Sequence, residues 1–172
     1  LSSGFEGGVA VRCQNKKRWL IDTSAKPLTD DLYDQLGVEE DKAYRLVSEG
    51  LIPVRKGSFW GFIDTAGNCV IPPQFNEVGH FHDGLAVVKF KHGHLAYIDQ
   101  LGQIQLDENY DVATRFHDGA AIIANDQGTY VIDKSGKHLF DATGIKSYSE
   151  GLFLWQDKSK EPINYFYNYQ YD

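Results

Sequence analysis

A segment of about 35 residues recurs along this chain of 172 residues, and each copy carries the same two short signatures. An acidic residue followed by Gly opens each copy, and an Ile-Asp pair followed by a turn lies in its middle. A fixed period of this size is typical of an array of small units that bury their apolar faces only against their neighbours. The acidic-Gly pairs end at Gly7, Gly50, Gly84, Gly119 and Gly151, and the Ile-Asp pairs end at Asp22, Asp64, Asp99 and Asp133.

Each copy contains three short runs that are rich in β-branched and aromatic residues, as strands are. In one copy these runs are Leu85 to Phe90, Leu95 to Asp99 and Ile104 to Leu106, with Gly-containing turns between them. The predicted fold is all-β, an array of four antiparallel β-meander repeats of about 35 residues with a C-terminal capping strand. A closed ring like a β-propeller is the alternative, although propeller repeats are usually longer and carry four strands.

The repeats predict a single domain over residues 1–172. We expect units at about 6–48, 49–82, 83–117 and 118–149, and a C-terminal cap at 150–172. The first unit is longer than the next two by an insertion within Val38 to Leu46. Because the insertion has helix formers and neither Gly nor Pro, we predict one or two helical turns there, on the surface.

The turn after the Ile-Asp pair is the most regular element of the chain. An Asp at its first position can accept a hydrogen bond from the backbone N–H two residues on, and a Gly at its fourth position tolerates a positive φ. We therefore interpret both residues as structural, and a ladder of cation-binding carboxylates is the less favoured alternative. The residues concerned are Asp64 and Gly67, Asp99 and Gly102, Asp133 and Gly136, and, with Ala in place of Gly, Asp22 and Ala25.

Composition excludes several classes of function. The net charge of −7 disfavours binding to nucleic acid, and no apolar stretch approaches the roughly 20 residues of a membrane span. Cys13 and Cys69 lie at different phases of the repeat and have no metal-ligand spacing, so we interpret them as free thiols. The compartment stays open, with the cytoplasm slightly favoured.

No catalytic motif is present, and we expect neither an enzyme nor a cofactor. The histidines invite a metal hypothesis, because His80 and His82 are two residues apart, as are His92 and His94. However, His82 shares its repeat position with His117, beside an acidic-Gly turn, and His92 and His94 flank a turn Gly. We therefore predict no metal site.

The C-terminal segment alternates Tyr with other residues. On a strand, these Tyr side chains would share one face. They would either cap the last unit or form an aromatic platform for a sugar chain or a protein. The candidate binding residues are Tyr165, Tyr167, Tyr169, Tyr171 and Trp155.

One copy carries a family signature. The string WGFIDTAGNCVIPPQF, which contains Trp60 and Gly61, is preceded by EGLIPV and resembles the bacterial WG-repeat family. The other copies depart from that pattern, with Arg18, Leu95 and Thr129 at the Trp position. The resemblance implies β-rich repeats without shared catalytic residues.

Repeat arrays mostly act by presenting a surface to a partner. We therefore expect a non-enzymatic module that binds a protein through an extended β surface. One alternative is a carbohydrate- or cell-wall-binding module that uses the Tyr strand. Another is an acidic immunity-type protein that inhibits a basic toxin enzyme.

Overall fold

The computed structural model describes residues 4–40, 43–142, 145–149, 152–155 and 165–168, which form small antiparallel sheets. The fold is all-β, as predicted, and none of the described segments is a helix that could cross a membrane. The first sheet pairs β1 (Val9–Gln14) with β2 (Lys17–Asp22). The second has the order β3 (Gln35–Leu36), β6 (Leu51–Lys56), β7 (Phe59–Asp64), β8 (Cys69–Phe75).

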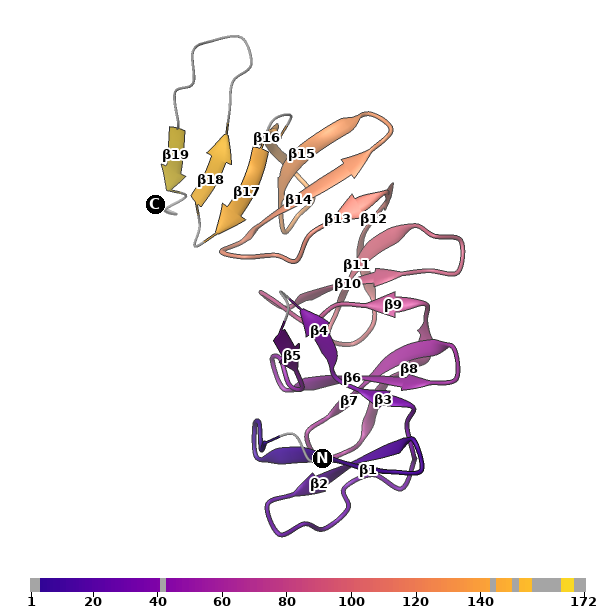
Figure 1. The fold of residues 1–172 in the computed structure, drawn as a ribbon. Coiled ribbons are helices and arrows are strands. Elements are labelled where there is room, and N and C mark those ends of the chain that lie inside the picture. Colours follow the sequence, from indigo (N-terminus) through magenta and orange to yellow (C-terminus); the bar gives the residue numbers. More distant parts are fainter. Residues whose placement is uncertain (1–3, 41–42, 143–144, 150–151, 156–164, 169–172) are drawn as a thin grey trace.

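The next sheets repeat this order. The third runs β9 (Glu77–Val78), β10 (Leu85–Lys89), β11 (Leu95–Asp99), β12 (Ile104–Tyr110). The fourth runs β13 (Val112–Ala113), β14 (Ala120–Asn125), β15 (Gly128–Asp133), β16 (His138–Asp141). Figure 1 shows the sheets following one another in an open succession, with β1 and β2 at one end and β17 to β19 at the other.

Each four-stranded sheet takes its first strand from the preceding copy. We call β3, β9 and β13 donor strands, because they end one copy and pair with β6, β10 and β14 of the next. The hydrogen bonds that start this pairing recur at the same place. The amides of Asp34, Asn76 and Asp111 donate to the carbonyls of Arg55, Lys89 and Ala124 at 2.8, 2.8 and 2.9 Å.

A second set of bonds lies three residues further along each donor segment. The amides of Gly37, Gly79 and Thr114 donate to the carbonyls of Pro53, Val87 and Ile122 at 2.8, 2.8 and 2.9 Å. Backbone hydrogen bonds thus tie each copy to the next. Each four-stranded sheet therefore contains residues from two successive sequence copies.

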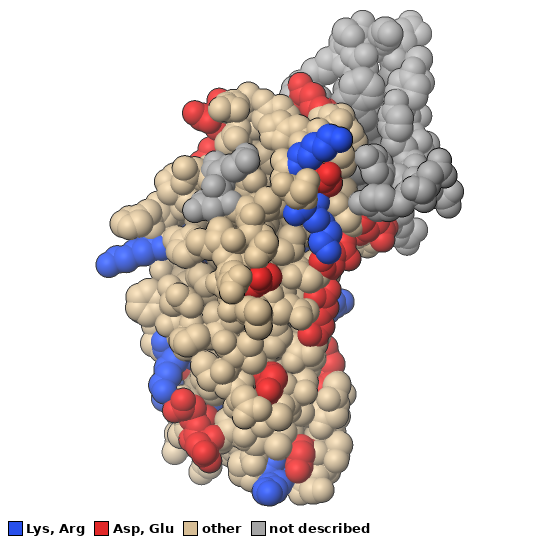
Figure 2. Space-filling view, turned by 180° about the vertical axis from the view of Figure 1, so that it is seen from behind, with Lys and Arg blue, Asp and Glu red and all other residues tan. Residues whose placement is uncertain are grey.

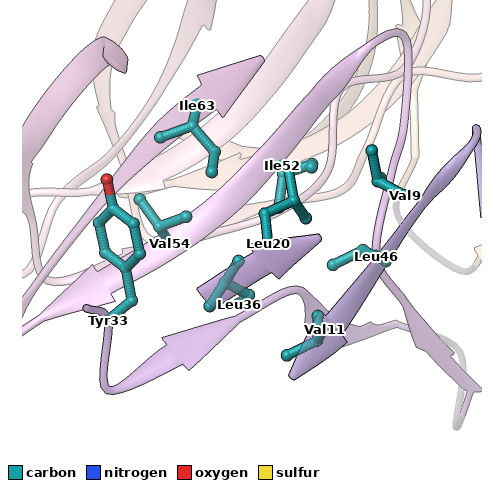
Figure 3. Close-up of a cluster of buried hydrophobic side chains, with 9 residues drawn as sticks. All are labelled: Val9, Val11, Leu20, Tyr33, Leu36, Leu46, Ile52, Val54 and Ile63. Carbon is teal, nitrogen blue, oxygen red and sulfur yellow. The ribbon is translucent and has the colours of Figure 1, made fainter. Parts of the chain in front are cut away.

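The hydrophobic cores lie between successive sheets. Figure 3 shows the first core, where Leu20 of β2 gathers with Ile52 of β6 and Ile63 of β7, all 0% exposed. Two further cores combine the second sheet with the third and the third with the fourth. The described copies therefore bury their apolar side chains against neighbours, as the repeat period predicts.

The insertion in the first copy is a β-hairpin, so the predicted helical turns are wrong. In it, β4 (Val38–Glu40) pairs with β5 (Ala43–Arg45). The Tyr44 hydroxyl donates to the carbonyl of Leu36 and lies against Gly37, where a Cβ would be 2.7 Å from the hydroxyl oxygen. After the hairpin, Leu46 enters the first core at 1% exposure. These tertiary contacts outweigh the helix propensity of the insert.

The C-terminal region adds a sheet rather than one capping strand. Its order is β17 (Ile145–Ser149), β18 (Leu152–Trp155), β19 (Tyr165–Asn168). In sequence, β18 follows the acidic-Gly pair that ends at Gly151, as β6, β10 and β14 follow theirs. The region thus repeats the order of donor, first and second strand.

The Trp-Gly pair lies on β7, at a register shift against β8. Trp60 is half-buried, and the Arg55 guanidinium carbon lies 5.7 Å from the centre of its ring. At Gly61 the two strands are so close that a Cβ would lie 2.3 Å from the carbonyl oxygen of Ile71. Gly is therefore required here for space and not for its φ.

We predict that Gly61→Ala lowers the free energy of unfolding by about 1–3 kcal/mol, the usual cost of overpacking. Gly79→Ala is the matched control, because its Cβ would meet nothing closer than the Val87 carbonyl oxygen at 3.7 Å. Urea denaturation of both variants provides the measurement. Equal losses in the two variants would contradict the steric explanation.

Candidate functional site

The two acidic turns of each copy lie at the same edge of the array. The register pairs Leu51 with Asp64 and Leu85 with Asp99, so the turn that precedes the first strand lies beside the turn that follows the second. Figure 2 shows Asp and Glu side chains following one side of the molecule. We call this side the acidic edge and define it by Asp22, Glu49, Asp64, Asp83, Asp99, Asp118 and Asp133.

The Asp turns are built identically in the four copies. Asp64 Oδ1 accepts from the amides of Ala66 at 2.9 Å and Asn68 at 2.8 Å, two and four residues on. The sequence predicts the bond from Ala66, two residues after Asp64. The bond from Asn68 is an additional one that the sequence did not indicate. The same pairs of bonds form at Asp22, Asp99 and Asp133.

The glycines of these turns also touch the preceding copy. Gly67 has φ +90°, and a Cβ there would lie 2.2 Å from the carbonyl oxygen of Leu28. A Cβ on Gly102 would lie 3.1 Å from an Ile71 side-chain carbon, and one on Gly136 would lie 2.9 Å from Leu106. These glycines therefore serve both the turn and the stacking of copies.

The acidic-Gly turns connect neighbouring copies. Glu49 and Gly50 have φ of 49° and 80°, the pattern of a type I′ hairpin turn. The Glu49 carboxylate accepts from the amide of Gly84 at 3.0 Å, and the Asp83 carboxylate accepts from Gly119 at 2.8 Å. Sequence reasoning missed this contact. The recurrence of an acidic residue was the signal that could have revealed it. The turn geometry alone is satisfied equally well by Asn or Gly, so an acid in every copy indicates a further contact.

The first copy departs from this arrangement by one residue. Gly7 and Gly8 occupy the positive-φ positions, at 60° and 81°, and Glu6 precedes them. The Glu6 carboxylate accepts from the amides of Leu46 and Val47 at 3.0 and 3.2 Å. The acid thus holds the chain where it returns from the insertion.

Hydrogen bonds keep two of the edge carboxylates ionised. Burial acts to raise the pKa of Asp64, but bonds from the Asn68 side chain and from backbone amides outweigh it, so the pKa lies below its ordinary value. The Ser135 hydroxyl, followed by the amides of Lys137 and Ser135, lowers the pKa of Asp133. The carboxylates of Asp64 and Asp133 therefore keep their negative charge to lower pH than their ordinary pKa would allow.

A shallow hollow of about 290 Å³ interrupts the acidic edge. Asp83, Asp99, Gln105 and Lys134 line it together with the backbone of the third copy's first turn. Asp99 Oδ2 accepts from the Gln105 side chain at 2.9 Å.

The opposite edge holds the hairpin turns within each sheet, and there three lysines pair with acids. Lys17 contacts Asp34 at 2.6 Å, and Lys89 contacts Glu77 at 3.0 Å. Lys56 likewise contacts Asp31 at 2.9 Å. The Lys17 bond is the main cause that lowers the pKa of Asp34. The two edges of the array therefore differ in charge.

The histidines do not come together. His82 and His117 each begin an acidic-Gly turn, His92 and His94 are exposed, and His80 is 1% exposed. Across the residues that the structure describes, no group of three His, Cys, Asp or Glu could hold a metal ion. Cys13 and Cys69 are exposed free thiols.

The structure reaches only part of the Tyr segment. Tyr165 and Tyr167 lie on β19, whose backbone pairs with Trp155 and Phe153 of β18. Tyr169 and Tyr171 lie outside the described residues, as do the side chains of Tyr165, Tyr167 and Trp155. The proposed aromatic platform therefore stays a sequence-based prediction.

Comparison with protein families matches residues 60–92 to the family described as WG containing repeat. The match starts at Trp60, runs through β8, β9 and β10, and thus spans the junction between the second and third sheets. A search of curated proteins finds no match to the chain.

The Asp64 turn should make stability depend on acid. Because the pKa of Asp64 is lower in the folded chain, its stabilisation is present above the ordinary value of 3.8 and is lost as pH falls through the folded value. The melting temperature of Asp64→Asn should therefore fall less on acidification than that of the wild type. Thermal melts from pH 6 down to pH 3 provide the measurement, with Asp126→Asn, at an exposed hairpin turn outside the Asp turns, as the control variant.

Ala25 has a strained backbone conformation, which can be tested by substitution. It adopts φ 62° where the other copies have Gly, and a non-Gly residue pays about 1–2 kcal/mol in that conformation. Ala25→Gly should therefore raise the free energy of unfolding by about 0.5–1 kcal/mol after the greater chain entropy of Gly is subtracted. Ala66→Gly, in the next copy's turn at a residue without positive φ, should lower it. A stability loss in both variants would show that the turn stores no strain at Ala25.

Proposed function

We propose that this WG-repeat chain is a non-enzymatic protein-binding module whose acidic edge docks on a basic surface of a partner. The observation that carries the proposal is the alignment of both acidic turns of successive copies on one edge. An extended row of like charges is suited to a partner surface of opposite sign, which it attracts at long range and orients on contact.

The edge is prepared for such contact. Backbone amides fix one oxygen of each Asp-turn carboxylate, and amides of the next copy fix Glu49 and Asp83. A preorganised charge loses little side-chain freedom when a Lys or Arg approaches it. On the opposite edge Lys17, Lys56 and Lys89 already have acidic partners, so that edge offers less unbalanced charge.

The same observation supports inhibition of a basic enzyme as a second candidate function. An acidic protein that covers the basic substrate channel of a toxin would use the acidic edge in the same way. Loss of that enzyme's activity on mixing would separate this candidate from simple docking. Pelleting with insoluble peptidoglycan would instead favour the carbohydrate alternative.

Neutralising the acidic edge should weaken binding to a basic probe. We compare Glu49→Gln/Asp83→Asn/Asp118→Asn with Asp31→Asn/Glu77→Gln/Asp126→Asn, which removes as many charges from the opposite edge. A fluorescent oligolysine peptide serves as the probe in anisotropy titrations at low salt. The first variant should lose about tenfold in affinity, since each exposed charge contributes roughly 0.2–1 kcal/mol, and the second should lose much less.

Both variants have the same net charge, so the comparison isolates position. Glu→Gln and Asp→Asn keep the oxygen acceptors that hold the copies together, and thermal melts would verify that the fold is unchanged. Equal weakening by the two variants would mean that only net charge matters, and the proposal would fail.

A further inference from the structure

The first strand of the first sheet has a partner on one side only, within the residues that the structure describes. The strands β6, β10 and β14 each lie between a donor strand and the second strand of their own copy. In contrast, β1 pairs with β2 alone among the described strands. The position that a donor strand fills in the other sheets is thus open beside β1.

The open position presents known hydrogen-bonding groups. The register of β1 on β2 matches that of β6 on β7, since Val9 faces Asp22 as Leu51 faces Asp64, and Gln14 faces Lys17 as Lys56 faces Phe59. Val11 and Cys13 therefore correspond to Pro53 and Arg55. In β6 the carbonyls of those two residues accept the donor amides of Gly37 and Asp34.

Pro53 supports this assignment independently. The Pro53 carbonyl bonds to β3, so the proline nitrogen, which has no N–H, also faces β3, and the pairing of β6 with β7 loses no hydrogen bond. Alternate residues of a strand direct their backbone groups to opposite neighbours. The Val11 and Cys13 carbonyls therefore point away from β2, toward the open side.

The three donor segments of the chain show what fits such a position. Each has an aromatic residue, then Asp or Asn, two further residues of which the second is apolar, and then Gly or Thr. The second and fifth residues supply the two amides that bond to the first strand of the next sheet. The segments are Tyr33 to Gly37, Phe75 to Gly79 and Tyr110 to Thr114.

We propose that the outer side of β1 is a docking edge for a donor strand of this pattern, contributed by another WG-type repeat. The donor strands β3, β9 and β13 are already paired, as is β17 at the equivalent place in the C-terminal sheet, so a second copy of this chain has no donor to offer among its described strands. The incoming strand adds to the sheet edge by main-chain hydrogen bonds to Val11 and Cys13. The array thereby extends beyond its first sheet.

The edge is accessible for such pairing. Arg12, Cys13 and Gln14 are exposed, whereas the Val11 side chain is buried in the first core at 7% exposure, so Val11 would take part through its backbone carbonyl. This surface differs from the acidic edge and uses backbone groups rather than carboxylates. Failure of one proposal therefore leaves the other standing.

A synthetic peptide with the sequence of residues 72–80 tests the proposal on the full chain. Carbonyl ¹³C resonances are followed by NMR as millimolar peptide is added. We expect shifts at Val11 and Cys13, whereas Pro53 and Arg55, whose carbonyls are already bonded to a donor, should not move. The matched control peptide carries N-methyl groups on the residues that correspond to Asn76 and Gly79, and it should cause no shift.

The two exposed thiols give a second readout. The peptide should slow modification of Cys13 by a thiol reagent severalfold and leave Cys69, in β8, unaffected. Shifts at Pro53 and Arg55 would show strand exchange with β3 and overturn the proposal. Equal effects of both peptides, or no shift at Val11 and Cys13, would overturn it as well.

Discussion

The backbone hydrogen bonds between a donor strand and the next sheet are the interaction on which the rest of the molecule depends. Each net bond contributes only about 0.5–1.5 kcal/mol, so the two bonds of one junction are modest by themselves. Their importance is geometric. They hold the next sheet against the preceding one, and only in that position can side chains such as Leu20 and Ile63 share a dry core.

The acids of the repeat divide two structural tasks between them. Asp64 and its equivalents close a turn within one copy, whereas Glu49 and Asp83 reach the amide of the following copy. Backbone amides donate hydrogen bonds to both sets of carboxylates, so these charges on the edge face N–H dipoles. The edge therefore carries closely spaced carboxylates and also forms the contact between successive copies.

The sequence predicts the local elements of this fold well. Strand composition locates β10 and β11, and the Asp-turn chemistry follows from residues only two to four positions apart. The donor strands escaped prediction because two residues cannot display a hydrophobic period. The insertion was misjudged because propensity says nothing of Tyr44 packing on Gly37. The acidic edge was recognised only as separate turns, since their alignment depends on strand register.

The turn glycines that abut the preceding copy have a consequence for the shape of the array. Gly67, Gly102 and Gly136 set how closely successive sheets approach at the acidic edge, because a single added methyl group would press on Leu28, Ile71 or Leu106. The spacing of the donor junctions is fixed separately by backbone bonds. The difference between the spacing at the acidic edge and the spacing at the donor junctions then determines how strongly the array curves. A larger residue at one turn would push the sheets apart on that side and bend the row of carboxylates.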